Sequence, residues 1–167
     1  RVDVLDLEAV SAIAHQAGLP FVVDNTFASP YLCRPFDYGA DIVIHSATKY
    51  IGGHGDAMGG AVIGRKKDLD ALNLEASVHF GGVMSPFNAW VLSKSLETLA
   101  VRVDRHCENA QKAADFLEMS KKVSQVKYPF LKSHPSYAIA KKQMRLGGNI
   151  VAFELKGGLE AGRKFLD

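Results

Sequence analysis

The sequence predicts an α/β fold with a mostly parallel sheet flanked by helices. Two short apolar runs, residues 20–24 and 41–45, have the composition of strands that are buried on both faces of a parallel sheet. Amphipathic patterns over residues 6–18 and 66–78 predict helices around these strands. Residues 60–64 are a third short apolar run and predict one more strand of the same sheet.

The second half of the chain changes its pattern. Ser85 and Pro86 have the residue types of an N-cap and a first helical position, and no proline or glycine follows before Met119. One long helix that connects two domains is therefore expected. Residues 1–120 are interpreted as part of a large domain, and residues 121–167 as the start of a smaller α+β domain.

Within the smaller domain the pattern predicts a βαβ start followed by a further helix. The strands are expected at residues 123–128 and 149–155, and the helices at 136–144 and 160–166. The chain begins at Arg1 without a methionine, which indicates a segment of a longer protein.

Composition excludes several classes of function. The net charge is only +2, and no basic run is longer than two residues, so no nucleic-acid partner is expected. No apolar stretch approaches the length of a membrane span, so no membrane partner is expected. Two distant cysteines, Cys33 and Cys107, form no disulfide framework and favour a reducing cytoplasm as the location.

Two charged residues follow the predicted buried strands. Asp24 ends the strand at 20–24, and Lys49 comes just after the strand at 41–45, in a segment with hydroxyls at Ser46 and Thr48. Open α/β sheets bind ligands beyond the carboxyl ends of their strands, so these side chains are candidates for one site. An acid and a lysine in this position form either a simple ion pair or half of a cofactor site.

Pyridoxal 5′-phosphate (PLP) requires this set of groups. Its aldehyde needs a lysine amine, its pyridine nitrogen needs a carboxylate that keeps it protonated, and its phosphate needs hydroxyls or backbone amides. Lys49 supplies the amine, Asp24 the carboxylate, and Ser46 and Thr48 the hydroxyls.

The stretches VVDNTFASPYLCRPFDYGADIVIHSATKYIGGHGD, SPFNAWVLSKSLETL and GGNIVAFELKGG resemble the Cys/Met-metabolism family of PLP enzymes over essentially the whole chain. The resemblance implies a type I PLP-dependent transferase fold, similar to that of aspartate aminotransferase. It implies that Lys49 is the catalytic, Schiff-base lysine and that Asp24 is the partner of the ring nitrogen. Ser46 and Thr48 would bind the phosphate.

The same resemblance implies trans-sulfuration chemistry in a cytoplasmic homotetramer with shared active sites. The expected reaction is γ-elimination or γ-replacement on methionine, cystathionine or an O-acyl-homoserine, most similar to methionine γ-lyase. O-Acetyl- or O-succinyl-homoserine sulfhydrylase and cystathionine γ-synthase remain alternatives, because Ser77 and Val78 stand where methionine γ-lyases have a Lys-Asp pair. Family groups that stack on the ring or bind the substrate carboxylate have no counterpart here, so the chain alone is expected to be inactive.

Interpretations from other classes stay open at this point. Residues 46–49 also read S-x-x-K, the nucleophile motif of serine acyl-enzymes, although S-D-N and K-T-G are missing. His45, His54 and Asp56 lack the regular spacing of metal ligands, and no metal site is predicted. A protein that binds PLP without catalysing a reaction is a further alternative.

Overall fold

The computed structural model describes residues 2–167, apart from the side chain of residue 71. The chain divides into two compact units, of which the larger is Asp6–Arg102. The other contains Val103–Asp167 together with the amino-terminal residues up to Leu5. Compact units of this chain need not be domains of a longer protein, so the domain boundary at residue 120 stays a prediction.

The larger unit begins with the predicted helix, α1 (Leu7–Gln16). Its first turn is capped by Asp6, whose carboxylate accepts a hydrogen bond of 3.1 Å from the backbone N–H of Ala9. Gly18, just beyond the helix, has a positive φ of 70°, a conformation that glycine adopts without strain. The pattern of residues 6–18 is thus confirmed as a helix with a glycine stop.

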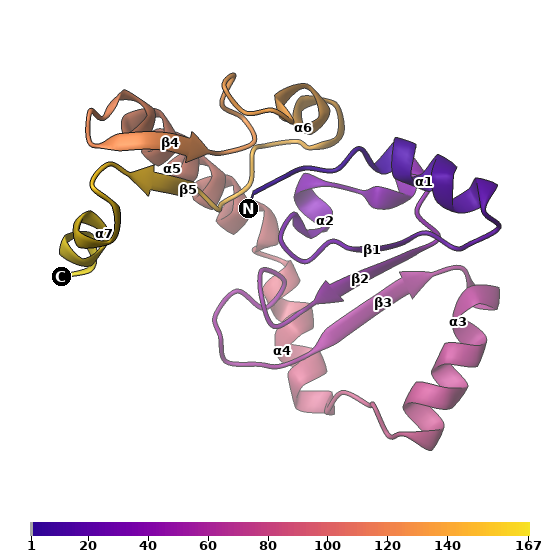
Figure 1. The fold of residues 1–167 in the computed structure, drawn as a ribbon. Helices are drawn as coiled ribbons and strands as arrows, with labels where there is room; N and C mark the ends of the chain where they lie inside the picture. The colour runs from indigo at the N-terminus through magenta and orange to yellow at the C-terminus, as the bar shows by residue number, and fades with distance from the viewer. Residues whose placement is uncertain (1) are drawn as a thin grey trace. The chain divides into compact units, whose positions relative to one another are not determined.

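A three-stranded sheet of order β1-β2-β3 forms the centre of this unit (Figure 1). β1 (Val22–Asp24) and β2 (Ile42–Ser46) run parallel, and their register places Asp24 level with Ile44. β3 (Gly60–Gly64) pairs with the other edge of β2 in the antiparallel direction. The three predicted strands are present, and the parallel direction holds for the pair that carries the candidate site.

Alternation along β2 separates its two faces. Val43 and His45 are buried on one face, with 2% and 4% of their surface exposed. Ile44, on the opposite face, is 36% exposed. Ser46 shares that opposite face, two residues further along the strand.

Short helices fill the connections of the larger unit. Between β1 and β2 lie α2 (Ser29–Leu32) and the 3₁₀ turn η1 (Pro35–Tyr38). After β3 come α3 (Lys66–Asn73), the π-helical segment η2 (Leu74–His79) and α4 (Pro86–Leu96). The hydroxyl of Ser85 accepts from the N–H of Asn88 (3.2 Å), which confirms the predicted start of α4.

The prediction of one unbroken helix from Pro86 to Met119 is wrong. The structure has two helices, α4 and α5 (Leu99–Met119), with a turn between them. At this turn the carbonyl of Ser95 accepts from the backbone and hydroxyl of Thr98 (both 3.2 Å) and from Nη2 of Arg102 (2.9 Å). These bonds take the place of the α-helical bond to this carbonyl, so the helix closes in a tighter turn and restarts.

The second unit contains β4 (Val123–Lys127), α6 (Tyr137–Gln143), β5 (Ala152–Leu155) and α7 (Gly158–Leu166). The elements follow the predicted order, but β4 and β5 pair antiparallel and so do not form a parallel βαβ unit. Its core packs the side chains of α5 against the segment that follows β4: Ala110, Ala114, Tyr128 and Leu131.

Among residues 2–167, none of the helices combines the length and the apolar character that a membrane span requires.

Candidate functional site

The parallel pairing of β1 and β2 brings Asp24 and Ser46 to the same end of the sheet. Asp24 is the last residue of β1, Ser46 is the last residue of β2, and Ile44 lies level with Asp24. Because parallel neighbours in register present the same face, the side chains of these three residues lie on one side of the sheet. Two of the predicted site residues are therefore placed together.

Asp24 is held as a carboxylate by the residue two positions on. Its Oδ1 accepts hydrogen bonds from the hydroxyl of Thr26 (2.6 Å) and from the backbone N–H of Thr26 (3.0 Å). These bonds keep the pKa of Asp24 below its usual value, and the bond from the hydroxyl has the larger effect. Burial acts in the opposite direction. Oδ2 of Asp24 accepts no hydrogen bond from any described residue.

Lys49 lies on a single turn that directly follows β2. Its backbone N–H donates to the carbonyl of Ser46 (3.1 Å), and its own carbonyl accepts from the N–H of Gly53 (2.7 Å). The N–H of Gly52 donates to the carbonyl of Ala47 (2.7 Å) and closes the turn. The Lys49 side chain is exposed, and its Nζ makes no hydrogen bond or ion pair within residues 2–167.

The two candidate phosphate ligands differ in how their groups are used. The backbone N–H of Ser46 donates to the hydroxyl of Thr26 (2.8 Å), and the Ser46 side chain is half-buried. The hydroxyl of Thr48 accepts from the N–H of Gly59 (3.0 Å) and donates to the carbonyl of the same residue (3.2 Å). Thr48 thus fixes the glycine-rich loop (residues 52–60) against the turn that carries Lys49.

Arg102 anchors that turn from the far end of the unit's sequence. Nη1 donates to the carbonyl of Tyr50 (2.8 Å) and Nη2 to the carbonyl of Ile51 (3.2 Å). The same side chain also bonds the hydroxyl of Thr98 (3.0 Å) and the carbonyl of Ser95 (2.9 Å), at the junction of α4 and α5. The fixed fork of a guanidinium suits four such acceptors at once.

His45 lies on the opposite face of β2 from Ser46. Its side chain is 4% exposed, and its Nδ1 has no hydrogen-bond partner in the described chain. Burial lowers the pKa of His45, against the opposing charge of Asp24, so the imidazole is neutral near pH 7. No group of three metal-ligating side chains occurs within residues 2–167.

The S-x-x-K interpretation fails on geometry. That motif needs its serine at the start of a helix, with the lysine one turn further on. Ser46 instead ends the strand β2, and a single turn follows it before the glycine-rich loop.

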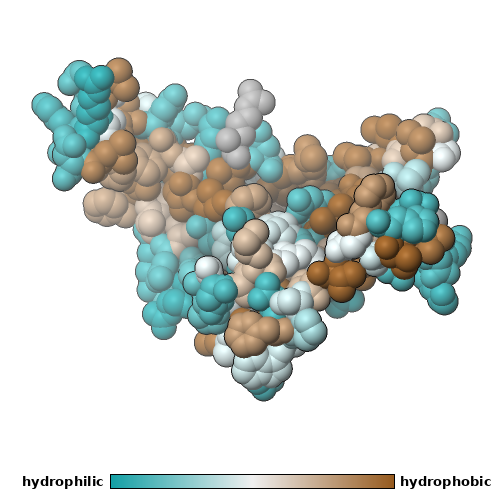
Figure 2. Space-filling model, turned by 90° about the horizontal axis from the view of Figure 1, so that it is seen from below, coloured by the Kyte–Doolittle hydropathy of each residue, from teal (hydrophilic) through white to brown (hydrophobic). Residues whose placement is uncertain are grey.

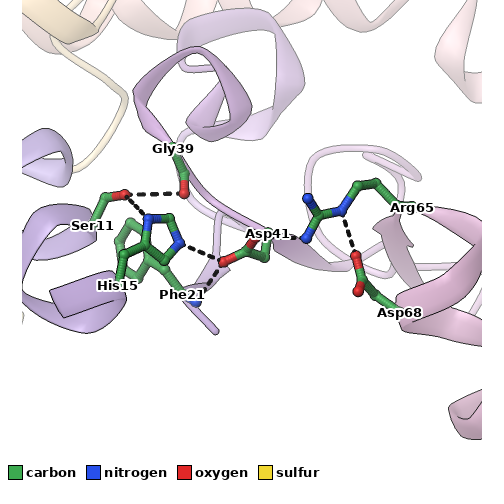
Figure 3. Close-up of polar contacts among 7 residues, drawn as sticks. All are labelled: Ser11, His15, Phe21, Gly39, Asp41, Arg65 and Asp68. Carbon is green, nitrogen blue, oxygen red and sulfur yellow. Dashed lines mark hydrogen bonds and ion pairs between the residues drawn. The ribbon is translucent and has the colours of Figure 1, made fainter. Parts of the chain in front are cut away.

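A second polar cluster lies at the opposite end of β2 and contains a serine, a histidine and an aspartate (Figure 3). Nε2 of His15 meets Oδ2 of Asp41 at 2.7 Å, and Nδ1 of His15 lies 3.4 Å from the hydroxyl of Ser11. Ser11 is 6% exposed, and its hydroxyl donates to the carbonyl of Gly39 (3.1 Å). A serine nucleophile must be accessible and must give its proton to the histidine, whereas Ser11 is buried and gives its proton to a carbonyl, so this cluster is not a hydrolytic triad.

Asp41 instead joins three elements at the amino end of the sheet. Its Oδ2 also accepts from the backbone N–H of Phe21 (2.9 Å), and its Oδ1 from Nη2 of Arg65 (2.8 Å) (Figure 3). Nε of Arg65 further pairs with Asp68 at 2.6 Å. Ligand sites of α/β sheets form at the carboxyl ends of the parallel strands, so a ligand is expected near Asp24 and Lys49 and not at this cluster.

Comparison with known proteins decides the family. The model of the family described as "Cys/Met metabolism PLP-dependent enzyme" matches residues 1–167. The chain belongs to this family. The resemblance on which Lys49 and Asp24 were assigned is thereby confirmed, and the family is PLP-dependent.

Individual relatives agree with this assignment. The chain is 48% identical over 164 residues to L-methionine gamma-lyase of Porphyromonas gingivalis, a match that covers 97% of this chain and 41% of the relative. It is 49% identical over 152 residues to cystathionine beta-lyase of Lactococcus lactis subsp. cremoris, covering 91% of this chain and 40% of the relative. The chain therefore spans less than half the length of these relatives.

Solved structures confirm the type I PLP-dependent fold. Cystathionine gamma synthase of Xanthomonas oryzae pv. oryzae, in complex with aminoacrylate and cysteine, is 43% identical with a TM-score of 0.93, covering 98% of this chain and 42% of that chain. A methionine gamma lyase of Micromonospora echinospora is 41% identical with a TM-score of 0.88, and the match covers 93% of this chain and 42% of that chain.

The residues at this end of the sheet fit PLP. The charge of the ionised Asp24 suits a protonated ring nitrogen, and the exposed Lys49 suits the aldehyde. Ile44 lies level with Asp24 and leaves 36% of its surface exposed, which offers an apolar contact beside the carboxylate.

Two residues of this site are not indicated by the sequence patterns above. Thr26 follows Asp24 by two positions, and an aspartate that bonds the backbone two residues on is a known turn, so a local signal for Thr26 exists. Arg102 bonds residues 51 and 52 positions away, and nothing in the local sequence marks it.

Proposed function

We propose that the whole protein is a PLP-dependent enzyme of sulfur amino acid metabolism that carries out γ-elimination or γ-replacement. The observation that carries the proposal is the placement of Asp24, Ser46 and Lys49 at the carboxyl ends of the parallel strands β1 and β2. The similarity to L-methionine gamma-lyases, at 45–48% identity, supports the same conclusion.

When bound, PLP supplies an electron-accepting ring that stabilises negative charge on the substrate's α-carbon. Oδ2 of Asp24 would accept the hydrogen bond of the protonated ring nitrogen, and the lowered pKa of Asp24 would keep it ionised for this purpose. Nζ of Lys49 would hold the cofactor's aldehyde carbon and, once free, would serve as the general base that moves protons to and from the substrate.

Ser46 and Thr48 contact the phosphate in this proposal. The Thr48 hydroxyl now donates to the carbonyl of Gly59 over a long 3.2 Å, so a turn of its O–H bond frees that proton for an anionic oxygen. It continues to accept from the N–H of Gly59, which keeps the side chain in place while the proton changes partner.

The substrate is proposed to be methionine, which elimination followed by hydrolysis with one water molecule converts to a 2-oxo acid, ammonia and a thiol. Replacement chemistry on an O-acyl-homoserine, as in a sulfhydrylase or in cystathionine γ-synthase, is the second candidate. The specific observation in its favour is the TM-score of 0.93 to cystathionine gamma synthase of Xanthomonas oryzae pv. oryzae. Incubation of the whole protein with methionine, and separately with O-acyl-homoserines and cysteine, distinguishes the two through 2-oxobutyrate or thioether products.

The decisive variant is Lys49→Ala in the whole protein. We expect loss of the visible absorbance band of the lysine-bound cofactor and loss of turnover, because Lys49 is the lysine on the turn that directly follows β2. Lys66→Ala is the matched control, since Lys66 is an exposed lysine whose Nζ pairs only with Asp70, at 2.8 Å. Retention of the band in Lys49→Ala contradicts the assignment. A band without turnover of any sulfur amino acid in the unmodified protein favours a non-catalytic PLP-binding protein.

We also propose that the protein assembles with itself, as a homotetramer, in the cytoplasm. Support for assembly comes from large apolar side chains that are exposed along η2, the loop after it and α4: Leu74, Val78, Phe80, Val83, Phe87 and Trp90. Apolar side chains are exposed at the surface in the view of Figure 2. Such exposure is typical of surfaces that bind another protein. Light scattering of the protein and of Phe80→Glu tests this, with a smaller assembly expected for the variant, because Phe80 is 83% exposed.

A further inference from the structure

The hydroxyl of Thr26 lies between two parts of the candidate site. It is 2.6 Å from Oδ1 of Asp24 and 2.8 Å from the backbone nitrogen of Ser46. Thr26 is 7% exposed, so water does not compete freely for these bonds. One side chain thus connects the end of β1 with the end of β2.

The direction of both bonds is fixed by chemistry. A backbone N–H can only donate, so the hydroxyl of Thr26 accepts from Ser46. A threonine hydroxyl has a single proton, and its remaining partner is Oδ1 of Asp24, which must therefore be the acceptor. The chain of bonds runs from Ser46 through Thr26 to Asp24.

This polarity determines which oxygen of Asp24 faces a ligand. Oδ1 accepts two hydrogen bonds from Thr26, while Oδ2 accepts none from the described residues. Two hydrogen bonds to Oδ1 restrict the rotation of this carboxylate and so limit the directions in which Oδ2 can point. A hydroxyl that donates to the carboxylate also favours its charged form, which is the form that binds a ring N–H.

We propose that Thr26 is a positioning residue for the cofactor: its hydroxyl aligns the Asp24 carboxylate on the pyridine nitrogen and locks this carboxylate to the strand end that leads to Lys49. This inference rests on the proposed function. It goes further, because it assigns to a threonine outside the predicted set the task of keeping the two halves of the site in register.

The test compares Thr26→Val with Thr26→Ser in the whole protein, with PLP affinity measured by titration of the cofactor-free form. Valine keeps the shape and removes the hydroxyl, whereas serine keeps the hydroxyl. We expect PLP to bind about tenfold to a hundredfold more weakly to Thr26→Val, the range for a lost hydrogen bond to a charged group. Thr26→Ser is expected to restore most of this affinity.

The pH dependence of PLP affinity separates positioning from general loss of structure. In the unmodified protein the lowered pKa of Asp24 keeps the carboxylate ionised as the pH falls. Without the hydroxyl the pKa of Asp24 rises, so in Thr26→Val the acid limb of the affinity profile moves to higher pH. In an Asp24→Asn background, Thr26→Val is expected to have little additional effect, because its partner has no charge left to stabilise.

Each outcome has a distinct meaning. If the unmodified protein does not bind PLP, the proposed function fails. Two results overturn the inference on Thr26 and leave the proposed function standing. In the first, Thr26→Val binds PLP with the affinity and the acid limb of the unmodified protein. In the second, Thr26→Val weakens PLP binding as much in the Asp24→Asn background as it does when Asp24 is present. If Thr26→Val does not fold, Thr26→Ala removes the same hydroxyl with a smaller side chain and is measured in its place.

Discussion

Replacement of Arg102 by methionine is expected to loosen the turn that carries Lys49. Arg102 donates to the carbonyls of Tyr50 and Ile51, the two residues that directly follow the lysine. Hydrogen bonds from charged groups contribute about 1.5–3 kcal/mol each, and the lower end applies here because Arg102 is only half-buried. With two bonds lost and part of the loss recovered by water, local opening becomes easier by about 2 kcal/mol, or roughly 30-fold.

Hydrogen exchange of the whole protein measures this directly. The N–H groups of Gly52 and Gly53 donate to Ala47 and Lys49 within the turn, so they exchange only when it opens. We expect roughly 30-fold faster exchange of this peptide in Arg102→Met. The exchange rate in Arg102→Lys should lie between those of the unmodified protein and Arg102→Met, since an ammonium lacks the fork that reaches several carbonyls.

Arg105→Met is the matched control, because Arg105 lies on the same helix and pairs only with Glu108, at 3.6 Å, with 71% of its side chain exposed. The reasoning is refuted if the turn exchanges at the same rate in Arg102→Met as in Arg105→Met.

Three further outcomes are expected. In a denaturant titration, Gly53→Ala should have a free energy of unfolding about 1–3 kcal/mol lower than Gly55→Ala. Both glycines have positive φ, but an added Cβ would meet Arg102 at 2.2 Å only at Gly53. Burial raises the pKa of Cys33 to about 11 and that of Cys107 above its usual value, so both thiols should react with a disulfide reagent at pH 8 far more slowly than in denaturant; equal rates would contradict their burial. Ser85→Ala should cost about 1 kcal/mol in a denaturant titration, through loss of the α4 cap, and an unchanged midpoint would show that the cap contributes nothing.

The end of the sheet that holds the candidate site could be predicted because the relevant signals are local. Buried parallel strands are continuous apolar runs, and polar residues that follow them must lie at one edge. The positions of Asp24 and Ser46 could therefore be predicted from the parallel direction of β1 and β2, without knowledge of other tertiary contacts. The roles of Lys49 and Thr48 toward the cofactor stay predictions, which the proposed variants address.

The remaining features depend on contacts that sequence patterns do not contain. The break between α4 and α5 arises from Ser95, Thr98 and Arg102, none of which is a helix-breaking residue. The antiparallel direction of β3 did have a signal: its connection from β2 contains no crossover helix, which a parallel neighbour would require. The direction of β3 therefore follows from the connection that precedes it and not from the composition of the strand.

The use of an arginine to hold the Lys49 turn has a consequence for how the site responds to acid. A guanidinium stays protonated across the whole range in which enzymes work, so the bonds from Arg102 to Tyr50 and Ile51 do not weaken as the pH falls. Asp24, in contrast, can take up a proton. We therefore expect the backbone around Lys49 to keep its conformation in acid, where the carboxylate has already lost its attraction for the ring nitrogen. Acid would then weaken the hold of Asp24 on the cofactor within an intact frame, and neutralisation would restore that hold without refolding.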